Sequence, residues 1–262
     1  ALAALRVPET GVIDFPGVCA ALVRRLERAG ATLRLGTEVL GASTVPGGLV
    51  VGTTTGDVRA DLVVNCAGLQ ADLVAARLGH RPSVRIVPFR GEYRELTPSS
   101  AHLVRGLVYP VPDPSLPFLG VHLTRGVDGH VHAGPNAVPA LAREGYRWRD
   151  VSPRDLAGVL GYAGSWRLTR RQARTGLAEV ARSLSQRRFT DSVRRLVPAL
   201  TGQDLVPAPA GVRAQAVRRD GTLVDDFLVE RSERVVHLLN APSPAATASL
   251  AIARNVAAML PT

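Results

Sequence analysis

Residues 237–260 read HLLNAPSPAATASLAIARNVAAML, and the stretch changes character in the middle. Its first residues are typical of a short buried strand. Two nearby prolines then precede a run of small residues at helical spacing, with Ser243 as a possible cap and no bulk at Ala245, Ala246 and Ala248. A helix N-terminus presents unpaired N–H groups, and small side chains let another group approach them. The stretch is about equally consistent with a helix start that contacts a ligand and with a helix that packs tightly on a sheet.

The composition is that of an ordinary globular protein. The chain has 262 residues, of which 46% are hydrophobic and 21% charged. No apolar run approaches the roughly 18 residues needed to span a bilayer, and the first ten residues, ALAALRVPET, lack the pattern of a secretory signal. We therefore expect a cytoplasmic protein, with peripheral contact at the inner membrane left open.

The net charge of +10 raises the question of nucleic-acid binding. All basic side chains other than histidine are arginines, they occur only in short clusters, and aromatic residues amount to 4%, too few for a stacking platform. We therefore expect no nucleic-acid partner. Cys19 and Cys66 lie far apart and are expected to be buried free thiols. His130 and His132 alternate as on a strand, which does not predict a metal site.

The order of predicted elements indicates an α/β fold built from discontinuous segments. A helix is expected from Pro16 to Gly30, strands over 31–44 and 48–68, and a short helix over 71–79. Antiparallel strands are expected over 83–134 and helices over 152–200, before strands and a final helix close the chain. The predicted boundaries are 1–82 and 207–262 for a core domain, with 83–206 as an inserted domain.

Several short motifs could carry chemistry, and each also has a purely structural interpretation. VVNCAGLQAD runs from a buried strand through Ala67–Gly68 into a helix, as at a ligand crossing point or in a simple tight turn. PFRGEYREL presents Arg90 on one strand face, where it could bind a carboxylate or face solvent. His122 suits proton transfer near neutral pH, with Arg125 and Asn136 as further polar groups, although a lone strand histidine is more often structural.

Taken together and in this order, the motifs resemble the bacterial L-2-hydroxyglutarate oxidase (dehydrogenase) family, among flavoproteins of the glycine/D-amino-acid-oxidase type. The matching stretches cover nearly the whole chain, and they are TGVIDF, VVNCAGLQAD, VPFRGEYREL, LVYPVPDPSLPFLGVHLTR, DGHVHAGPNAV, REGY, PAPAGVRAQAV, LVDDF and HLLNAPSPAATASLAI. The resemblance implies an FAD-binding α/β domain with an inserted antiparallel-sheet-plus-helices substrate domain. It also implies oxidation of L-2-hydroxyglutarate to 2-oxoglutarate, with electrons passed to oxygen or a membrane quinone.

The resemblance also implies roles for individual residues. The final helix would point its N-terminus at the flavin, Val39 would approach the adenine end, and residues 213–215 would line the flavin. The implied cofactor-binding set is Val39, Ala67, Gly68, Arg213, Ala214, Gln215, Asn240, Pro242, Ser243, Ala245 and Ala246. By chemistry at matched positions, Arg90 and then Arg125 would bind the carboxylates of the dianionic substrate, and His122 would be the base. Tyr109 and Asn136 would support them by hydrogen bonding.

One departure from the family pattern affects these expectations. The family begins with a strand, a G-x-G-x-x-G turn and a helix, and no such fingerprint occurs in this sequence. We therefore expect the N-terminal βαβ segment to be missing. Two alternatives to the leading hypothesis follow: a related flavoprotein that oxidises another 2-hydroxy or amino acid, and an inactive truncated fragment that does not bind FAD but binds only small anions or partners.

Overall fold

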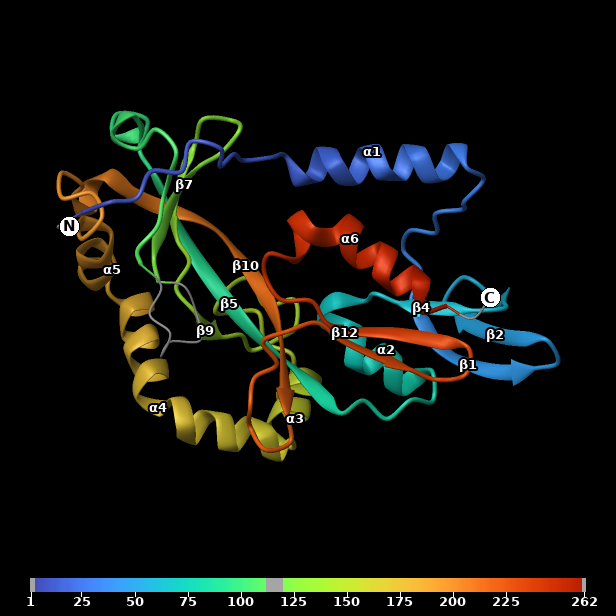
Figure 1. Cartoon of the computed structure of the whole chain (residues 1–262). Coiled ribbons are helices and arrows are strands. Elements are labelled where there is room, and N and C mark those ends of the chain that lie inside the picture. The colour runs from blue at the N-terminus through green and yellow to red at the C-terminus, as the bar shows by residue number, and fades with distance from the viewer. Residues whose placement is uncertain (1–2, 112–119, 261–262) are drawn as a thin grey trace. The chain divides into compact units, whose positions relative to one another are not determined.

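The computed structural model describes residues 3–111 and 120–260, and it divides the chain into two compact units. The first unit contains residues 1–14, 89–151 and 171–213, and the second contains residues 15–88, 152–170 and 214–262. Figure 1 shows the elements of both units along the chain. The domain boundaries expected from the sequence stay a prediction.

In the second unit, helix α1 (Phe15–Arg28) is followed by an antiparallel sheet of β1 (Val39–Val45), β2 (Gly48–Thr53) and β3 (Val58–Ala60). The turn between β1 and β2 has Gly47 at φ +80°, a backbone conformation that glycine adopts without steric cost. A β-bulge between Val39 and Gly41 interrupts the pairing of β1 with β2. These short hairpins account for the excursion that the sequence predicts between the first helix and the buried strand VVN.

A second sheet of this unit has the order β11–β12–β4, with β4 (Val63–Asn65), β11 (Leu228–Arg231) and β12 (Val235–Asn240). β4 and β12 are parallel, and His237 pairs with Asn65, 172 positions away in sequence. Each runs into a helix, β4 through η1 (Gly68–Gln70) into α2 (Ala71–Arg77) and β12 into α6 (Ala245–Ala258). The core beside this sheet is made of buried Ala71, Ala75, Val84, Ile86, Ala216, Val224 and Leu239.

The first unit is built on a larger antiparallel sheet with the order β10–β5–β8–β7–β6, and β9 pairs with β5. Its strands are β5 (Val84–Leu96), β6 (Leu107–Val108), β7 (His122–Arg125), β8 (Val131–Gly134), β9 (Val138–Pro139) and β10 (Leu205–Arg218). β5 and β10 also extend into the second unit. Two short 3₁₀ helices adjoin these strands. η2 (Ala101–Leu103) lies between β5 and β6, and η3 (Gly202–Asp204) directly precedes β10.

Three helices lie between β9 and β10 in sequence: α3 (Pro153–Leu160), α4 (Ala163–Leu184) and α5 (Gln186–Arg194). Ser152 caps α3 and Ser185 caps α5, each accepting a hydrogen bond from a backbone N–H of the first turn. Phe189 and Val193 of α5 pack with Leu96, Leu123 and Ala133 of the sheet, which form the core of the first unit. α5 and the second half of α4 lie along one side of this sheet (Figure 1).

The α/β architecture predicted from the sequence is confirmed, and three details differ. Cys19 and Cys66 are free but exposed, because α1 buries none of its residues and Cys66 follows β4 in the turn. Ser243 does not cap α6, whose N-cap is Pro244 without a side-chain hydrogen bond. The strand expected over 31–44 begins only at Val39. Part of the strand pattern expected near residue 110 falls at 112–119, outside the described residues. Among the described helices, none is both long and apolar enough to cross a membrane.

Candidate active site

One face of the sheet of the first unit packs against α5, and we call the opposite face the open face. The alternation of side chains along each strand shows which residues lie on which face. Leu123 is fully buried in the core beside α5, so His122 and Thr124 point to the other face. On β5, Arg94 lies over the Phe189 ring and Leu96 belongs to the same core. Tyr93 therefore shares the open face with His122.

His122 is held as a neutral imidazole, and among the described residues its Nε2 has no hydrogen-bond partner. Its Nδ1 lies 3.1 Å from the carbonyl oxygen of Gly120, and because that oxygen can only accept, Nδ1 carries the proton. Burial lowers the pKa of His122 despite the opposing effect of this hydrogen bond. The Nε2 lone pair is therefore left to accept a proton, as a general base requires.

Two tyrosines flank His122 across the sheet. The Tyr109 and His122 rings stack with centroids 4.5 Å apart, as expected because Tyr109 follows the strand pairing of Val108 with Leu123. On the other side His122 pairs with Gly134, and a Cβ on Gly134 would lie only 3.0 Å from Cδ1 of Tyr93. The Tyr93 ring therefore covers the glycine. Tyr93, Gly134, His122 and Tyr109 form what we call the open-face row.

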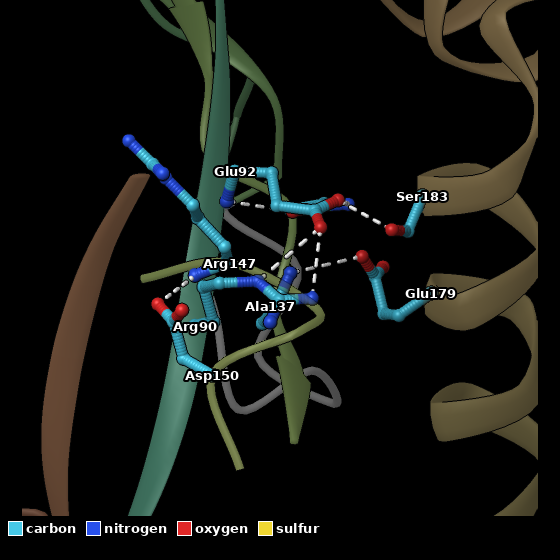
Figure 2. A network of polar contacts seen from close by, with 8 residues as sticks. Arg90, Glu92, Ala137, Arg147, Asp150, Glu179 and Ser183 are labelled. Atoms are coloured by element: carbon cyan, nitrogen blue, oxygen red, sulfur yellow. Dashed lines mark hydrogen bonds and ion pairs between the residues drawn. The ribbon is translucent and has the colours of Figure 1, made fainter. Parts of the chain in front are cut away.

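Arg90 lies on the helix side of the sheet, where it is fully buried. Its Nε and Nη2 donate to Glu92 Oε1 at 3.3 and 3.0 Å, and its guanidinium lies 4.2 Å from the centre of the Trp148 ring. Its Nη1 is buried without a hydrogen-bond partner among the described residues. Figure 2 shows that Arg90 and Glu92 project from one strand, with Glu92 directed toward Ser183 on α4.

Glu92 gathers the remaining polar groups of this network. Its carboxylate accepts hydrogen bonds from Asn136 Nδ2, at 2.9 Å, and from the Ser183 hydroxyl, while its backbone N–H donates to Asn136 Oδ1 at 2.8 Å. Burial raises the pKa of the Glu92 carboxyl, but these hydrogen bonds and the charge of Arg90 outweigh it, so the pKa lies below its usual value. Glu92 is therefore the carboxylate that neutralises Arg90.

The structure thus separates the groups expected to bind and convert the substrate. His122 and Tyr109 lie together on the open face, whereas Arg90 and Asn136 lie in the Glu92 network on the other face. Arg125 donates from Nη1 to the carbonyl oxygens of Ala101 and Val104, both at 3.2 Å, and so holds the η2 turn. Direct substrate contact by Arg90 would require the Trp148 side chain to move.

In the second unit, the ends of β4 and β12 form the region where cofactor contacts are expected. Asn65 Oδ1 accepts the Ala67 N–H at 3.1 Å, and Asn65 Nδ2 donates to the Ala71 carbonyl at 2.8 Å. Asn65 thereby spans the turn that contains Gly68, which has φ +53° and open space where a Cβ would lie. In open α/β sheets, ligands bind at the carboxyl ends of parallel strands, so this turn is well placed for one.

Buried His237 supports Asn65 from the neighbouring strand. Its Nδ1 lies 3.1 Å from Asn65 Nδ2, and because an amide nitrogen donates, Nδ1 is the acceptor. The His237 ring also stacks on His80 at 4.7 Å, and His80 Nε2 lies 2.5 Å from Glu230 Oε2. Burial, with a smaller contribution from the charge of His80, lowers the pKa of His237 to about 4. His237 is therefore neutral at physiological pH.

The start of α6 fits an electron-rich ligand. No side chain caps it, its first turn contains no acidic residue, and Pro242 and Ala245 are only partly exposed. The first N–H groups of the helix therefore keep their capacity to donate, and Ser243 and Ala246 add little bulk. Together with the open backbone at Gly68, these residues are compatible with the flavin and pyrophosphate of FAD.

The remaining residues expected at the cofactor are distributed over both units. Val39, Ala214, Gln215 and Asn240 belong to the second unit and Arg213 to the first. Gln215 and Asn240 are buried, and both donate to the Val224 carbonyl, so their amides brace the backbone between them. Val39 accepts a hydrogen bond from Arg77 at 2.7 Å through its carbonyl. All these cofactor assignments stay predictions. The described residues contain no cluster of three or more His, Cys, Asp or Glu side chains suited to a metal ion.

Sequence reasoning missed the residues that organise both regions. Tyr93 and Glu92 stand in the quoted motif around Arg90, and alternation alone could have assigned Tyr93 to the face opposite Arg90. Asn65 stands two positions before Ala67, where a short amide often braces a turn. Trp148, Ser183 and His237 come from distant segments, and no local pattern indicates their contacts.

Known proteins with similar sequences support the resemblance. The chain is 42% identical over 257 residues to L-2-hydroxyglutarate dehydrogenase of Indibacter alkaliphilus, covering 97% of this chain and 64% of that protein. It is 42% identical over 262 residues to the protein of that name in Escherichia coli K12, covering 100% of this chain and 62% of the relative. The chain thus spans somewhat less than two thirds of the curated relatives that it matches.

Solved structures agree on the fold. The L-alpha-glycerophosphate oxidase of Mycoplasma pneumoniae, solved with FAD bound, matches with a TM-score of 0.59 at 18% identity, over 91% of this chain and 53% of that chain. NikD, an amino acid oxidase of nikkomycin biosynthesis, matches with a TM-score of 0.56 at 19% identity, over 94% of this chain and 57% of that chain. A sequence model of the FAD dependent oxidoreductase (DAO) family matches residues 1–259. With a match over nearly its whole length, the chain belongs to the FAD dependent oxidoreductase family.

Proposed function

We propose that the protein to which this chain belongs oxidises L-2-hydroxyglutarate to 2-oxoglutarate with FAD as cofactor. The identity of 42% to proteins named for that substrate supports the proposal, and so does the fold. The single structural observation that carries it is the neutral His122 on the open face, whose Nε2 has no hydrogen-bond partner within the part of the chain that the structure describes. Oxidation of a secondary alcohol to a ketone requires a proton acceptor at the hydroxyl, and His122 has that chemistry.

The proposed mechanism assigns two tasks to the chain. His122 Nε2 accepts the proton of the C2 hydroxyl while Tyr109, stacked on the imidazole, fixes the orientation of the ring. Bound FAD would supply the hydride acceptor for C2, so that the alcohol would lose one hydride and one proton and become the ketone. The N–H groups at the start of α6 would be suited to hold the cofactor and to stabilise negative charge on it. Arg90 and Asn136 support this sheet from its other face through Glu92.

The electron acceptor in this proposal is oxygen or a membrane quinone, and the surface of α4 and α5 favours contact with an anionic membrane. Residues 171–195 contain seven arginines against two carboxylates. Leu177 and Leu184, seven residues apart on α4, are 72% and 74% exposed. Basic and apolar groups side by side on a helix surface bind anionic lipid interfaces. We therefore place the protein in the cytoplasm, peripheral at the inner membrane when quinone is the acceptor. Sedimentation with anionic and with neutral vesicles tests this contact, and equal binding to both would contradict it.

The decisive experiment follows the visible absorbance of FAD bound to the purified protein under anaerobic conditions. Addition of L-2-hydroxyglutarate should bleach the flavin, whereas the D enantiomer should not. L-Lactate, L-malate and glycine serve as competing candidates, and bleaching by one of these alone would favour a related 2-hydroxy or amino acid oxidase. A His122→Gln variant should bleach at least 100-fold more slowly, and a matched His130→Gln variant, altered at an exposed histidine, should not.

A further inference from the structure

The open-face row contains a residue, Tyr93, that the proposed mechanism does not use. Tyr93 lies on β5 beside Gly134, and Gly134 pairs directly with His122 on β7. Paired residues on adjacent antiparallel strands lie about 5 Å apart, so only Gly134, which has no side chain, lies between Tyr93 and His122 across the sheet. With Tyr109 stacked on the opposite side of His122, the histidine stands between two phenols.

Both phenols are available to a ligand. Within the part of the chain that the structure describes, neither the Tyr93 nor the Tyr109 hydroxyl has a hydrogen-bond partner. By contrast, Tyr146 donates to Glu144 and Tyr162 donates to the Val217 carbonyl. Burial, and then the nearby Tyr109, raise the pKa of Tyr93 above its usual value. The Tyr93 phenol therefore stays protonated and can donate a hydrogen bond.

The open face also lacks the arginines expected to bind the substrate. Arg90 is on the other face with Glu92, and Arg125 is engaged with the η2 turn. A 2-hydroxy acid whose hydroxyl lies at His122 Nε2 places its C1 carboxylate one bond away from C2, next to the same imidazole. That carboxylate therefore needs hydrogen-bond donors beside His122, and the O–H groups of the two phenols can donate to it.

We propose that Tyr93 is a substrate-contact residue that, together with Tyr109, donates a hydrogen bond to the C1 carboxylate of the 2-hydroxy acid at His122. This inference rests on the proposed function and adds to it the recognition of the α-carboxylate by phenols in place of a guanidinium. The proposed site requires glycine at position 134, because a Cβ there would lie 2.8 Å from the Glu92 carbonyl oxygen and would displace the Tyr93 ring.

The test is the Tyr93→Phe substitution, which removes one hydroxyl and keeps the ring over Gly134, in the full-length protein with FAD. Affinity for the product 2-oxoglutarate, measured by perturbation of the flavin spectrum, should fall about 10- to 100-fold, as for loss of a hydrogen bond to a charged group. KM for the substrate should rise similarly, while the Kd for FAD and the midpoint of thermal unfolding should stay within error. Tyr109→Phe should behave alike, and Tyr146→Phe, altered at a surface tyrosine, should match the wild type.

The outcomes separate this inference from the proposed function. If the wild type oxidises L-2-hydroxyglutarate and Tyr93→Phe binds 2-oxoglutarate within about twofold of it, the inference is wrong and the function stands. A parallel loss of FAD affinity or of thermal stability would also overturn it, because the hydroxyl would then be structural. If the wild type instead oxidises another 2-hydroxy or amino acid, the same loss is expected with that acid, since the α-carboxylate is common to all of them. A wild type that binds FAD but none of these acids overturns both.

Discussion

Replacing Glu92 with glutamine should destabilise the protein far more than the loss of an ordinary ion pair. Arg90 has a side-chain exposure of 1%, and Glu92 is the carboxylate with which it pairs. Removing one partner of a buried ion pair leaves an uncompensated charge and costs about 3–5 kcal/mol. The Trp148 ring remains over the guanidinium, and the Glu92 side chain is 22% exposed, so we expect the lower end, about 3 kcal/mol.

Thermal unfolding followed by circular dichroism measures this effect. For a protein of this size about 3 kcal/mol corresponds to a decrease in Tm of roughly 6–12 °C. Glu38→Gln is the matched control, because Glu38 also pairs with an arginine, Arg77, but its side chain is 60% exposed. That control should cost no more than about 1 kcal/mol. The double variant Arg90→Met/Glu92→Gln should recover part of the loss. A Tm for Glu92→Gln as high as that of the control would refute the reasoning.

Two further predictions concern the second unit. The pKa of His237 is about 4 in the folded protein and about 6.5 in the unfolded chain. The unfolded state therefore binds a proton more readily between these values. The free energy of unfolding should decrease by roughly 3 kcal/mol as the pH falls from 6.5 toward 4. Urea unfolding between pH 7 and 4.5 should show this slope, and His237→Asn should flatten it; an equal slope in both would exclude His237 as its source. Asn65→Ala removes the acceptor of the Ala67 N–H and should weaken FAD binding by about tenfold, measured by flavin fluorescence titration; an unchanged Kd would show that the turn needs no such brace.

Local patterns in the sequence were sufficient to predict most of the elements. Apolar spacing and a terminal glycine predict α1 and its end near Gly30, and the strand–turn–helix order around Gly68 and before α6 is equally visible. Such signals depend on neighbours within a few residues. The parallel pairing of β4 with β12 joins residues that lie 172 positions apart, and no local pattern indicates it.

The candidate site shows the limits of prediction from residue type. Arg90 and His122 are each suited to a 2-hydroxy acid, but residue type says nothing about which face of a sheet a side chain occupies. Burial decides the role of Arg90, since a fully buried guanidinium needs its own carboxylate, and Glu92 lies only two positions away. The prediction that Cys66 is buried was wrong for a related reason. Its position just after the strand, and not its residue type, determines whether its side chain is buried.

Strand β5 carries two different constraints on alternate residues. Arg90, Glu92 and Arg94 face the helices, whereas Gly91 and Tyr93 face the other way. Neighbouring residues of this strand would then be under different selective pressures. Those that face the helices would be selected for folding, and those on the open face for ligand preference. A library that varies Tyr93 should therefore explore new 2-hydroxy acids without loss of the fold, provided that Gly91 is kept, because a Cβ there would lie 2.8 Å from Cβ of Pro135.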